Sequence, residues 1–314
     1  MVSWSEFRGA LLAIGALLVV ILAIIVAQPG LPGELLLQSL RFHIVAAGLG
    51  LALLTMASGA RWRGALLLLV VLGAGAHGAS HVAEFQARRV DYAAPPKAQF
   101  RFLSYNVLAG NRQAQELVEA VVADPPDMAL VMETPGIEEH LDRLAEVLPY
   151  RAGCENTRTC DISLHSRFPF EEVRIINLVP LGRERLVVGK VSIEGQPVTV
   201  VGIHLTKPYY DNTAEIELFV INELLRSIEG PLILAGDFNA ASWSEPMVRA
   251  GRSQGLIPGP WQPATWPVRL GPLGVPIDNI FTRGTAQLLS LEAGENHGSN
   301  HRPLWAVVGL YGDD

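Results

Sequence analysis

Three long stretches without a charged residue limit what the first part of this chain can fold into. Each lies between two charged residues: Arg8 and Glu34, Arg41 and Arg61, and Arg63 and Glu84. A helix needs about 20 apolar residues to cross a bilayer, and these stretches have little of the polar patterning of a globular helix. We therefore expect three transmembrane helices, at about 9–27, 36–57 and 64–83, within a membrane region of residues 1–90.

A cleaved signal peptide is the alternative for the first stretch alone. Its apolar run is long, no good Ala-x-Ala site ends it, and two further stretches follow. We therefore interpret the first stretch as a retained anchor that contacts membrane lipids together with the other two.

Basic residues beside the stretches predict their orientation. Arg8 lies at the N-terminus, and three spans would place Arg61 and Arg63 on the same side of the membrane. Basic residues in short loops favour the cytoplasm. We expect a bacterial inner-membrane protein whose N-terminus is cytoplasmic and whose C-terminal part is periplasmic, although Arg88 and Arg89 count against this orientation.

The remainder of the chain has a different charge. The first 90 residues hold six arginines and three glutamates, a net charge of +3, so the remainder carries −10 of the total of −7. A part this acidic is poorly suited to binding long nucleic acid through its phosphates, so we expect no bulk nucleic-acid binding. Residues 91–98 contain Pro95 and Pro96 and predict a short stiff linker to a separate domain at 99–314.

Beyond this linker, short β-rich runs alternate with amphipathic segments. The expected strands lie at 100–107, 128–133, 162–166, 173–178, 186–193, 198–204, 232–236, 277–282, 287–291 and 304–310. The expected helices lie at 113–123, 138–148, 213–228 and 243–254. Many strands with few helices indicate two packed β-sheets flanked by helices, rather than strict βαβ alternation.

The chain has two cysteines, Cys154 and Cys160. Two unrelated thiols are one interpretation, and a zinc pair is disfavoured because no second cysteine pair exists. A short loop closed by a disulfide fits the spacing better. Such a bond requires an oxidising compartment, which agrees with the predicted periplasmic location.

Polar residues cluster where the expected strands end. They are Asn106, Glu133, His204, Asp237, Asn239, Asp278 and His301. Each alone is ordinary, because such side chains often cap turns or are solvated. Their occurrence at successive strand ends predicts one site at one edge of the double sheet.

This set of side chains suits phosphoester hydrolysis. Mg²⁺ prefers carboxylate and amide oxygens, and Glu133 is its natural ligand, while Asp237 is a candidate base for activating water. Asp278 is the candidate for orienting His301 through its second ring nitrogen. The candidate donors to the developing negative charge are Asn239, His204 and His301.

In these motifs the chain resembles the endonuclease/exonuclease/phosphatase superfamily, which has the DNase I-like fold, over roughly residues 99–310. The matching residues are Asn106, Glu133, His204, 236–239 (Gly-Asp-Phe-Asn), 276–278 (Pro-Ile-Asp) and 299–303 (Ser-Asn-His-Arg-Pro). The resemblance implies a four-layer α/β/β/α sandwich and catalysis with a divalent metal, Mg²⁺ or Mn²⁺. It also implies that Asn106 supports the metal, Glu133 ligates it and Asp237 positions or activates the attacking water.

The resemblance further implies that Asn239 and His204 contact the scissile phosphate, and that the Asp278–His301 pair polarises it. One position departs from the family pattern, since the usual Ser-Asp-His reads Ser-Asn-His here. Asn300 still offers an amide oxygen as a metal-side ligand but no negative charge. The change is expected to weaken metal binding or shift metal preference.

Three further residues are candidates for substrate binding. Arg167 lies in a segment that resembles one near the family's active-site edge, or it forms an ion pair at a strand end. Lys207, with Tyr209 and Tyr210, follows His204 closely and either contacts a phosphate or headgroup or forms a solvated loop. Trp266 either lines the substrate cleft or anchors its own loop.

The sequence therefore predicts a membrane-anchored phosphodiesterase or phosphatase that acts at the periplasmic face, with a lipid headgroup or small phosphoester favoured. One alternative is a periplasmic DNA endonuclease or exonuclease. The other is a catalytically impaired membrane binding protein, for which Asn300 is the only support in the sequence. The sequence does not specify the substrate, the metal or the oligomeric state.

Overall fold

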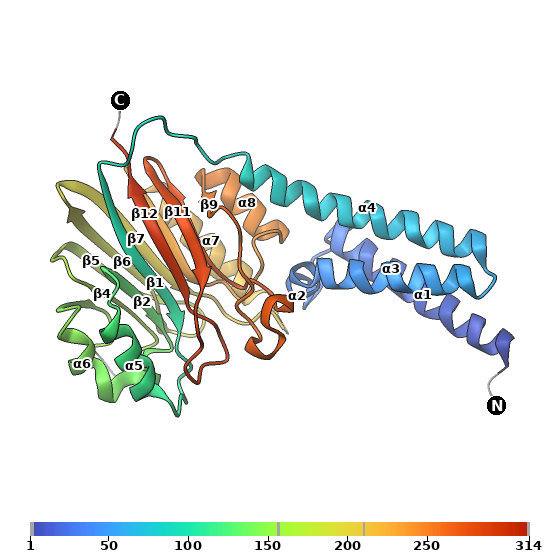
Figure 1. The fold of residues 1–314 in the computed structure, drawn as a ribbon, viewed down its shortest axis with the longest axis horizontal. Coiled ribbons are helices and arrows are strands. Elements are labelled where there is room, and N and C mark those ends of the chain that lie inside the picture. The colour runs from blue at the N-terminus through green and yellow to red at the C-terminus, as the bar shows by residue number, and fades with distance from the viewer. Residues whose placement is uncertain (1–2, 156–157, 210, 313–314) are drawn as a thin grey trace.

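The first part of the chain folds into a group of helices beside a β-rich domain (Figure 1). The structure is a computed structural model that describes residues 3–155, 158–209 and 211–312. The helices are α1 (Trp4–Ala27), α2 (Glu34–Ser39), α3 (Arg41–Ala57) and α4 (Arg61–Gln86).

Two of these helices, rather than the three expected, pass as membrane spans by length and composition. They are α1, with 24 residues, and α4, with 26, whereas α3 has 17. The prediction of one span at 36–57 is wrong, because the helix breaks at Leu40. Residues before the break belong to α2, where the Ser39 hydroxyl accepts a hydrogen bond from the backbone N–H of Ala241 at 3.0 Å. That contact binds α2 to the β-rich domain.

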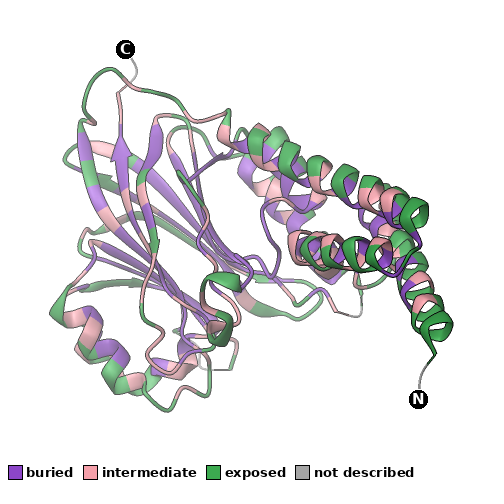
Figure 2. Ribbon diagram, turned by 45° about the vertical axis from the view of Figure 1, so that its right-hand side comes forward, coloured by how far each residue is buried: buried purple, intermediate pink, exposed green. Residues whose placement is uncertain are grey.

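The long helices run side by side in alternating directions. Trp4 on α1 donates to the carbonyl of Ser58 after α3, and Arg41 on α3 donates to the carbonyl of Ile25 on α1. Gly64 on α4 lies against the last turn of α3. Helices α1 and α4 therefore run in one direction and α3 in the other. Much of their outer surface is exposed (Figure 2), and it carries apolar side chains such as Leu69, which is 68% exposed.

The β-rich domain contains two six-stranded sheets. The first has the order β11 (Ala286–Ala293), β12 (Leu304–Leu310), β1 (Ala98–Asn106), β2 (Met128–Met132), β4 (Ile162–Ser166) and β3 (Tyr150–Ala152). The second has the order β5 (Phe170–Leu178), β6 (Arg183–Ile193), β7 (Gln196–His204), β8 (Leu232–Asp237), β10 (Asp278–Arg283) and β9 (Ile257–Pro258). The prediction of a mixed α/β fold with two sheets is confirmed.

The central strands are apolar on both faces because each face packs against another layer. In β1, Phe100 and Phe102 enter the core between the sheets, whereas Leu103 and Tyr105 pack under helices. Those helices are α5 (Ala114–Ala123) and α6 (Leu141–Ala145), with η1 (Thr134–His140) before them. On the second sheet, α7 (Thr213–Arg226) and α8 (Glu245–Gln254) cover the outer face. The domain thus has the layer order α/β/β/α.

The helices and the β-rich domain are joined by direct packing as well as by the chain that links them. At the end of α4, Phe85 is buried and stacks on Phe281 of β10, with ring centroids 5.7 Å apart. Val90 and Gln287 exchange two hydrogen bonds, of 2.9 and 2.8 Å. The predicted linker at 91–98 contains no helix and reaches β1 at its last residue. A packed seam, in addition to this linker, therefore holds the two parts together.

Candidate active site

The pairing of strands brings the predicted polar residues to one edge of the sandwich. Strands β1 and β2 are parallel, so Asn106 and Glu133 reach the same edge of the first sheet. In the second sheet, His204 lies opposite Asp237 across the parallel pair β7 and β8, and Asp278 lies opposite Asp237 across β8 and β10. The side chains from both sheets then meet.

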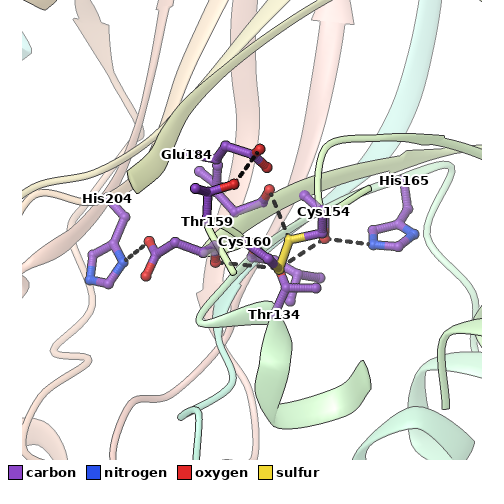
Figure 3. The surroundings of a disulfide bond; sticks show 11 residues. Thr134, Cys154, Thr159, Cys160, His165, Glu184 and His204 are labelled. Carbon is purple, nitrogen blue, oxygen red and sulfur yellow. Dashed lines mark hydrogen bonds and ion pairs between the residues drawn. A yellow bond between two sulfur atoms is a disulfide. The ribbon is translucent and has the colours of Figure 1, made fainter. Parts of the chain in front are cut away.

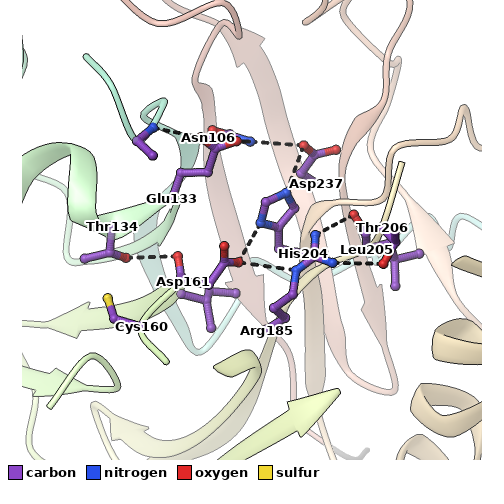
Figure 4. Close-up of polar contacts among 12 residues, drawn as sticks. Asn106, Glu133, Thr134, Cys160, Asp161, Arg185, His204, Leu205, Thr206 and Asp237 are labelled. Carbon is purple, nitrogen blue, oxygen red and sulfur yellow. Dashed lines mark hydrogen bonds and ion pairs between the residues drawn. The ribbon is translucent and has the colours of Figure 1, made fainter. Parts of the chain in front are cut away.

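The Asn106 side chain connects the two sheets (Figure 4). Its amide nitrogen donates to Glu133 Oε1 at 3.2 Å and to Asp237 Oδ2 at 3.1 Å. Its oxygen accepts the backbone N–H of Leu108, and the backbone N–H of Ala109 donates to the other oxygen of Glu133 at 2.7 Å. Asn106 therefore fixes the distance between the two carboxylates.

Glycine at position 236 is required by the close approach of β7 and β8. Gly236 has φ 141°, and a Cβ there would lie 1.8 Å from the carbonyl oxygen of Ile203. Three residues later, Asn239 adopts the left-handed region and donates its backbone N–H to Asp237 Oδ1 at 2.8 Å. The glycine thus allows the strand to place Asp237 deep in the site.

The predicted Asp278–His301 pair forms. Nδ1 of His301 and Oδ2 of Asp278 lie 2.8 Å apart, and Nε2 of His301 lies 3.8 Å from Asp237 Oδ2. Burial lowers the pKa of His301, but the charges of Asp278 and Asp237 outweigh burial and raise it to about 9. Burial and the Asp278 charge raise the pKa of Asp237 above its ordinary value. A buried carboxylate thus faces a protonated imidazole.

The second histidine has an aspartate partner that the sequence did not reveal. Nδ1 of His204 lies 2.6 Å from Oδ2 of Asp161, and its Nε2 lies 3.7 Å from Asp237 Oδ2. Burial opposes ionisation of Asp161, but the hydrogen bond from His204 and nearby arginines hold its pKa below the ordinary value. Asp237 is therefore flanked by two His–Asp pairs with the same arrangement.

Asp161 was missed because it precedes a strand rather than following one. Strand β4 is antiparallel to β2, so its first residue, Ile162, pairs with Met132 at the active-site edge. The adjacent Cys160 was the only local signal of a special position.

The predicted disulfide is present in the structure (Figure 3). Cys154 and Cys160 are joined by a 2.00 Å bond, and each is 8% exposed. The bond closes the loop between β3 and β4. It therefore lies directly before Asp161, at the rim of the site.

The donor set fits a hard divalent cation. Ligand atoms of Asp237, Asp278 and His301 lie within 4.8 Å of one another. Oδ1 of Asp278 is buried and has no hydrogen-bond partner among the described residues. Because Nδ1 of His301 is engaged with Asp278, the carboxylates, together with Glu133 across Asn106, are the donors best suited to Mg²⁺.

One of the predicted substrate-binding residues, Arg167, does not join this group. Arg167 follows β4 at its opposite end and forms an ion pair with Asp127 at 2.8 Å, which is the alternative that the sequence left open. Lys207 is exposed in the loop after β7. Tyr210 lies outside the described residues.

The third candidate, Trp266, borders the site. Trp266 and Asn239 line one small hollow together with Leu36 and Leu40, so α2 and the residue after it border the site. Asn300 is exposed, and its backbone carbonyl accepts from Val268 in η2 (Val268–Leu273). Its role at the metal remains a prediction.

A family model described as the endonuclease/exonuclease/phosphatase family matches residues 103–301. A curated relative, a UPF0294 protein of Vibrio cholerae serotype O1, is 34% identical over 116 residues, which is 35% of this chain. The match spans 40% of that relative's length.

Solved structures share the fold at low sequence identity. TDP2 of D. rerio, complexed with a single-strand DNA product, has a TM-score of 0.57 at 17% identity, covering 68% of this chain and 99% of that one. Beta toxin of Staphylococcus aureus with bound magnesium ions scores 0.52 at 14% identity, with coverages of 66% and 99%. Sphingomyelinase C of Streptomyces griseocarneus scores 0.51 at 15% identity, with coverages of 68% and 99%.

Proposed function

Because this chain belongs to the endonuclease/exonuclease/phosphatase family, we propose that it is a metal-dependent phosphoester hydrolase. One observation carries the proposal: a single buried carboxylate, Asp237, lies between two histidines that are each held by an aspartate. Burying charged groups together is costly unless they are paired. Such an arrangement is typical of a catalytic site.

The chain's own groups suit the proton transfers of hydrolysis. Asp237, with its raised pKa, accepts a proton from the attacking water. His301 is protonated at neutral pH and offers its Nε2–H to a phosphoryl oxygen. His204 and the Asn239 amide complete the donors. A divalent cation such as Mg²⁺ or Mn²⁺, held by the carboxylates of Glu133 and Asp278, would polarise the phosphoryl oxygen when bound.

We further propose that the enzyme is anchored in the bacterial inner membrane with its catalytic domain in the periplasm. Helices α1 and α4 run in the same direction, so α3 returns the chain through the same layer. At about 1.5 Å per residue, α3 spans about 25 Å, close to the lower limit for a bilayer. The disulfide supports an oxidising location.

The favoured substrate is a lipid headgroup or another small phosphoester. The net charge of −10 outside the membrane region disfavours long DNA, and the helical region borders the site through α2. A DNA nuclease is the second candidate, because the fold resembles TDP2, which was solved with a single-strand DNA product.

The test is a substrate screen of the full-length protein in detergent. With Mg²⁺ or Mn²⁺, we expect cleavage of an activated aryl phosphodiester and of phospholipid vesicles in preference to single-stranded DNA. Asp237→Asn should lower kcat by about a hundredfold or more, and Arg167→Ala, distant from the site, should leave it unchanged. Wild-type protein that cleaves none of these with either metal would refute the enzyme and support the membrane binding protein.

A further inference from the structure

Asp161 is placed where the two sheets meet. It precedes β4 in the first sheet, yet its carboxylate contacts His204 at the end of β7 in the second. The residue is buried, 7% exposed, and the same oxygen lies 3.5 Å from Nε of Arg185. Its position therefore affects the catalytic histidine directly.

The Asp161 carboxylate fixes the orientation of the His204 ring. A carboxylate accepts hydrogen bonds, so the proton of this 2.6 Å contact resides on Nδ1. That leaves Nε2 as the atom that faces Asp237 and the substrate. A carboxylate in this role sets both the tautomer and the direction of the imidazole.

The backbone of Asp161 is held from several sides. Its carbonyl accepts the backbone N–H of Thr134 at 3.0 Å, directly after Glu133. The preceding Thr159 accepts the backbone N–H of Glu184 on β6, and its hydroxyl donates to the Glu184 carboxylate at 2.8 Å. Between these contacts lies Cys160, whose disulfide ties the segment to Cys154.

The disulfide is the covalent part of this support. Strand β3 has three residues and lies at the edge of its sheet, so pairing alone restrains the loop weakly. At the start of the loop Gly153 has φ 93°, and a Cβ there would lie 2.6 Å from the carbonyl of Ile162. The chain at Gly153 thus lies tightly against β4, and the disulfide joins the next residue, Cys154, to Cys160.

The bond closes a loop of short sequence separation, six residues. Cross-links that close short loops restrict the unfolded chain less than those that close long ones. The location of the disulfide beside Asp161 therefore explains its presence better than global stabilisation of the fold does.

We propose that formation of the Cys154–Cys160 disulfide activates the enzyme by positioning Asp161, which in turn orients His204. This inference rests on the proposed hydrolase function. Two thiols exchange with a disulfide-bearing oxidant: one S–S bond forms in the chain, two electrons pass to the oxidant, and its disulfide leaves as two thiols carrying the two protons. Because both sulfurs are then buried, the step acts as maturation in an oxidising compartment.

The test compares full-length variants in detergent on an activated aryl phosphodiester with Mg²⁺. We expect Cys154→Ser/Cys160→Ser and Asp161→Asn each to lower kcat by about tenfold to a hundredfold with KM little changed. The triple variant should fall no further than the more impaired of the two, since both changes break one chain of contacts. Asp161→Glu, which keeps a carboxylate, should recover part of the loss.

A readout without turnover accompanies the kinetics. In protein labelled with ¹⁵N-histidine, the strongly hydrogen-bonded Nδ1 proton of His204 should appear downfield in the wild type. It should be lost in both the cysteine variant and Asp161→Asn. Thermal unfolding shows whether each variant is folded. If the cysteine variant does not fold, Asp161→Asn, which retains the disulfide, still tests the role of Asp161.

Two results would overturn the proposal: full activity of a folded cysteine variant, or losses that multiply in the triple variant. Persistence of the Nδ1 signal without the disulfide would also overturn it. An inactive wild type refutes the proposed hydrolase function instead, and the histidine signal then still decides whether the disulfide positions Asp161.

Discussion

At the scale of single residues, strand pairing decides which side chains meet. Asn106, Glu133 and His204 each lie at the end of an apolar strand or directly after it, and the paired strands bring them to one edge of the sandwich. Residues of this kind can be predicted from the sequence. Asp161 could not be predicted this way, because its contact with His204 depends on how two sheets pack. The sequence left two alternatives open for Arg167, and the structure shows the ion pair with Asp127, because a single segment does not reveal at which edge of the sheet its strand ends.

The buried His165 on β4 gives a prediction about pH. Burial, with the charge of Arg151, lowers the pKa of His165 to about 3. The unfolded chain binds this proton near pH 6.5. The contribution of His165 to stability is therefore complete above pH 6.5 and is lost as the pH falls towards 3.

We expect the melting temperature of the wild type to fall between pH 6.5 and pH 4, and that of His165→Gln to fall less. Intrinsic tryptophan fluorescence during heating in detergent measures both. Glutamine can still contact the Ser163 hydroxyl, which lies 2.9 Å from the His165 ring. An identical pH dependence of the melting temperature in the two proteins would show that protonation of His165 does not cause the loss of stability.

Asn300 provides a second prediction for a single residue. Restoring the family's charge with Asn300→Asp should lower the Mg²⁺ concentration needed for half-maximal activity. The position is exposed, so solvent screening limits the gain to about fivefold. A metal titration of activity measures it, with Arg167→Ala as the control, and an unchanged midpoint would place Asn300 outside the metal's influence.

At the scale of elements, most strands were predicted, and so were α5, α7 and α8 to within two residues at each end, whereas the other helices were not. The expected helix at 138–148 is divided between η1 and α6, because the chain after Glu133 first forms a tight turn. The break between α2 and α3 was missed because tertiary contacts cause it. Gln38 and Ser39 bind the segment that follows Asn239, and no local signal records that contact.

The contact of α2 with this segment gives a prediction. The side-chain oxygen of Gln38 accepts the backbone N–H of Glu245 at 2.7 Å, and Gln38 is 2% exposed. Gln38→Ala leaves that N–H without its partner, which costs about 1–3 kcal/mol. We expect lower thermal stability and lower kcat, because the loosened segment begins next to Asn239.

Arg249→Ala is the matched control, since Arg249 makes exposed contacts on the same helix, α8. It should leave both quantities close to wild type. Equal effects of the two substitutions would show that α2 does not support the site.

At the scale of the whole molecule, the two-sheet sandwich was predictable and the packing of the helices on it was not. Arg88 and Arg89 had counted against the predicted orientation. In the structure they donate to backbone carbonyls of the β-rich domain, at Leu256, Pro258 and Leu288. The packing of α4 on the domain therefore accounts for the positions of both arginines. A count of basic residues cannot distinguish arginines placed by packing from arginines that determine membrane orientation.

The seam between the parts predicts the effect of truncation. A fragment beginning at residue 91 would expose Phe281, which is fully buried by Phe85 and its neighbours. We expect this fragment to melt at lower temperature and to bind an apolar dye. A fragment beginning at residue 78 keeps the end of α4 and should show neither the lower melting temperature nor the dye binding. If the two fragments behaved alike, the seam would contribute little to stability.

In the proposed membrane-anchored arrangement, the continuity of α4 with the seam would set the distance between the active site and the membrane. The 26 residues of α4 span about 39 Å, of which about 30 Å would lie in the hydrocarbon layer. The remaining turns pack against the sandwich, so the domain would lie within about 10 Å of the lipid surface. Substrates that diffuse in that surface would reach the site by a two-dimensional search, whereas long polymers in the bulk would rarely enter the space between the domain and the membrane.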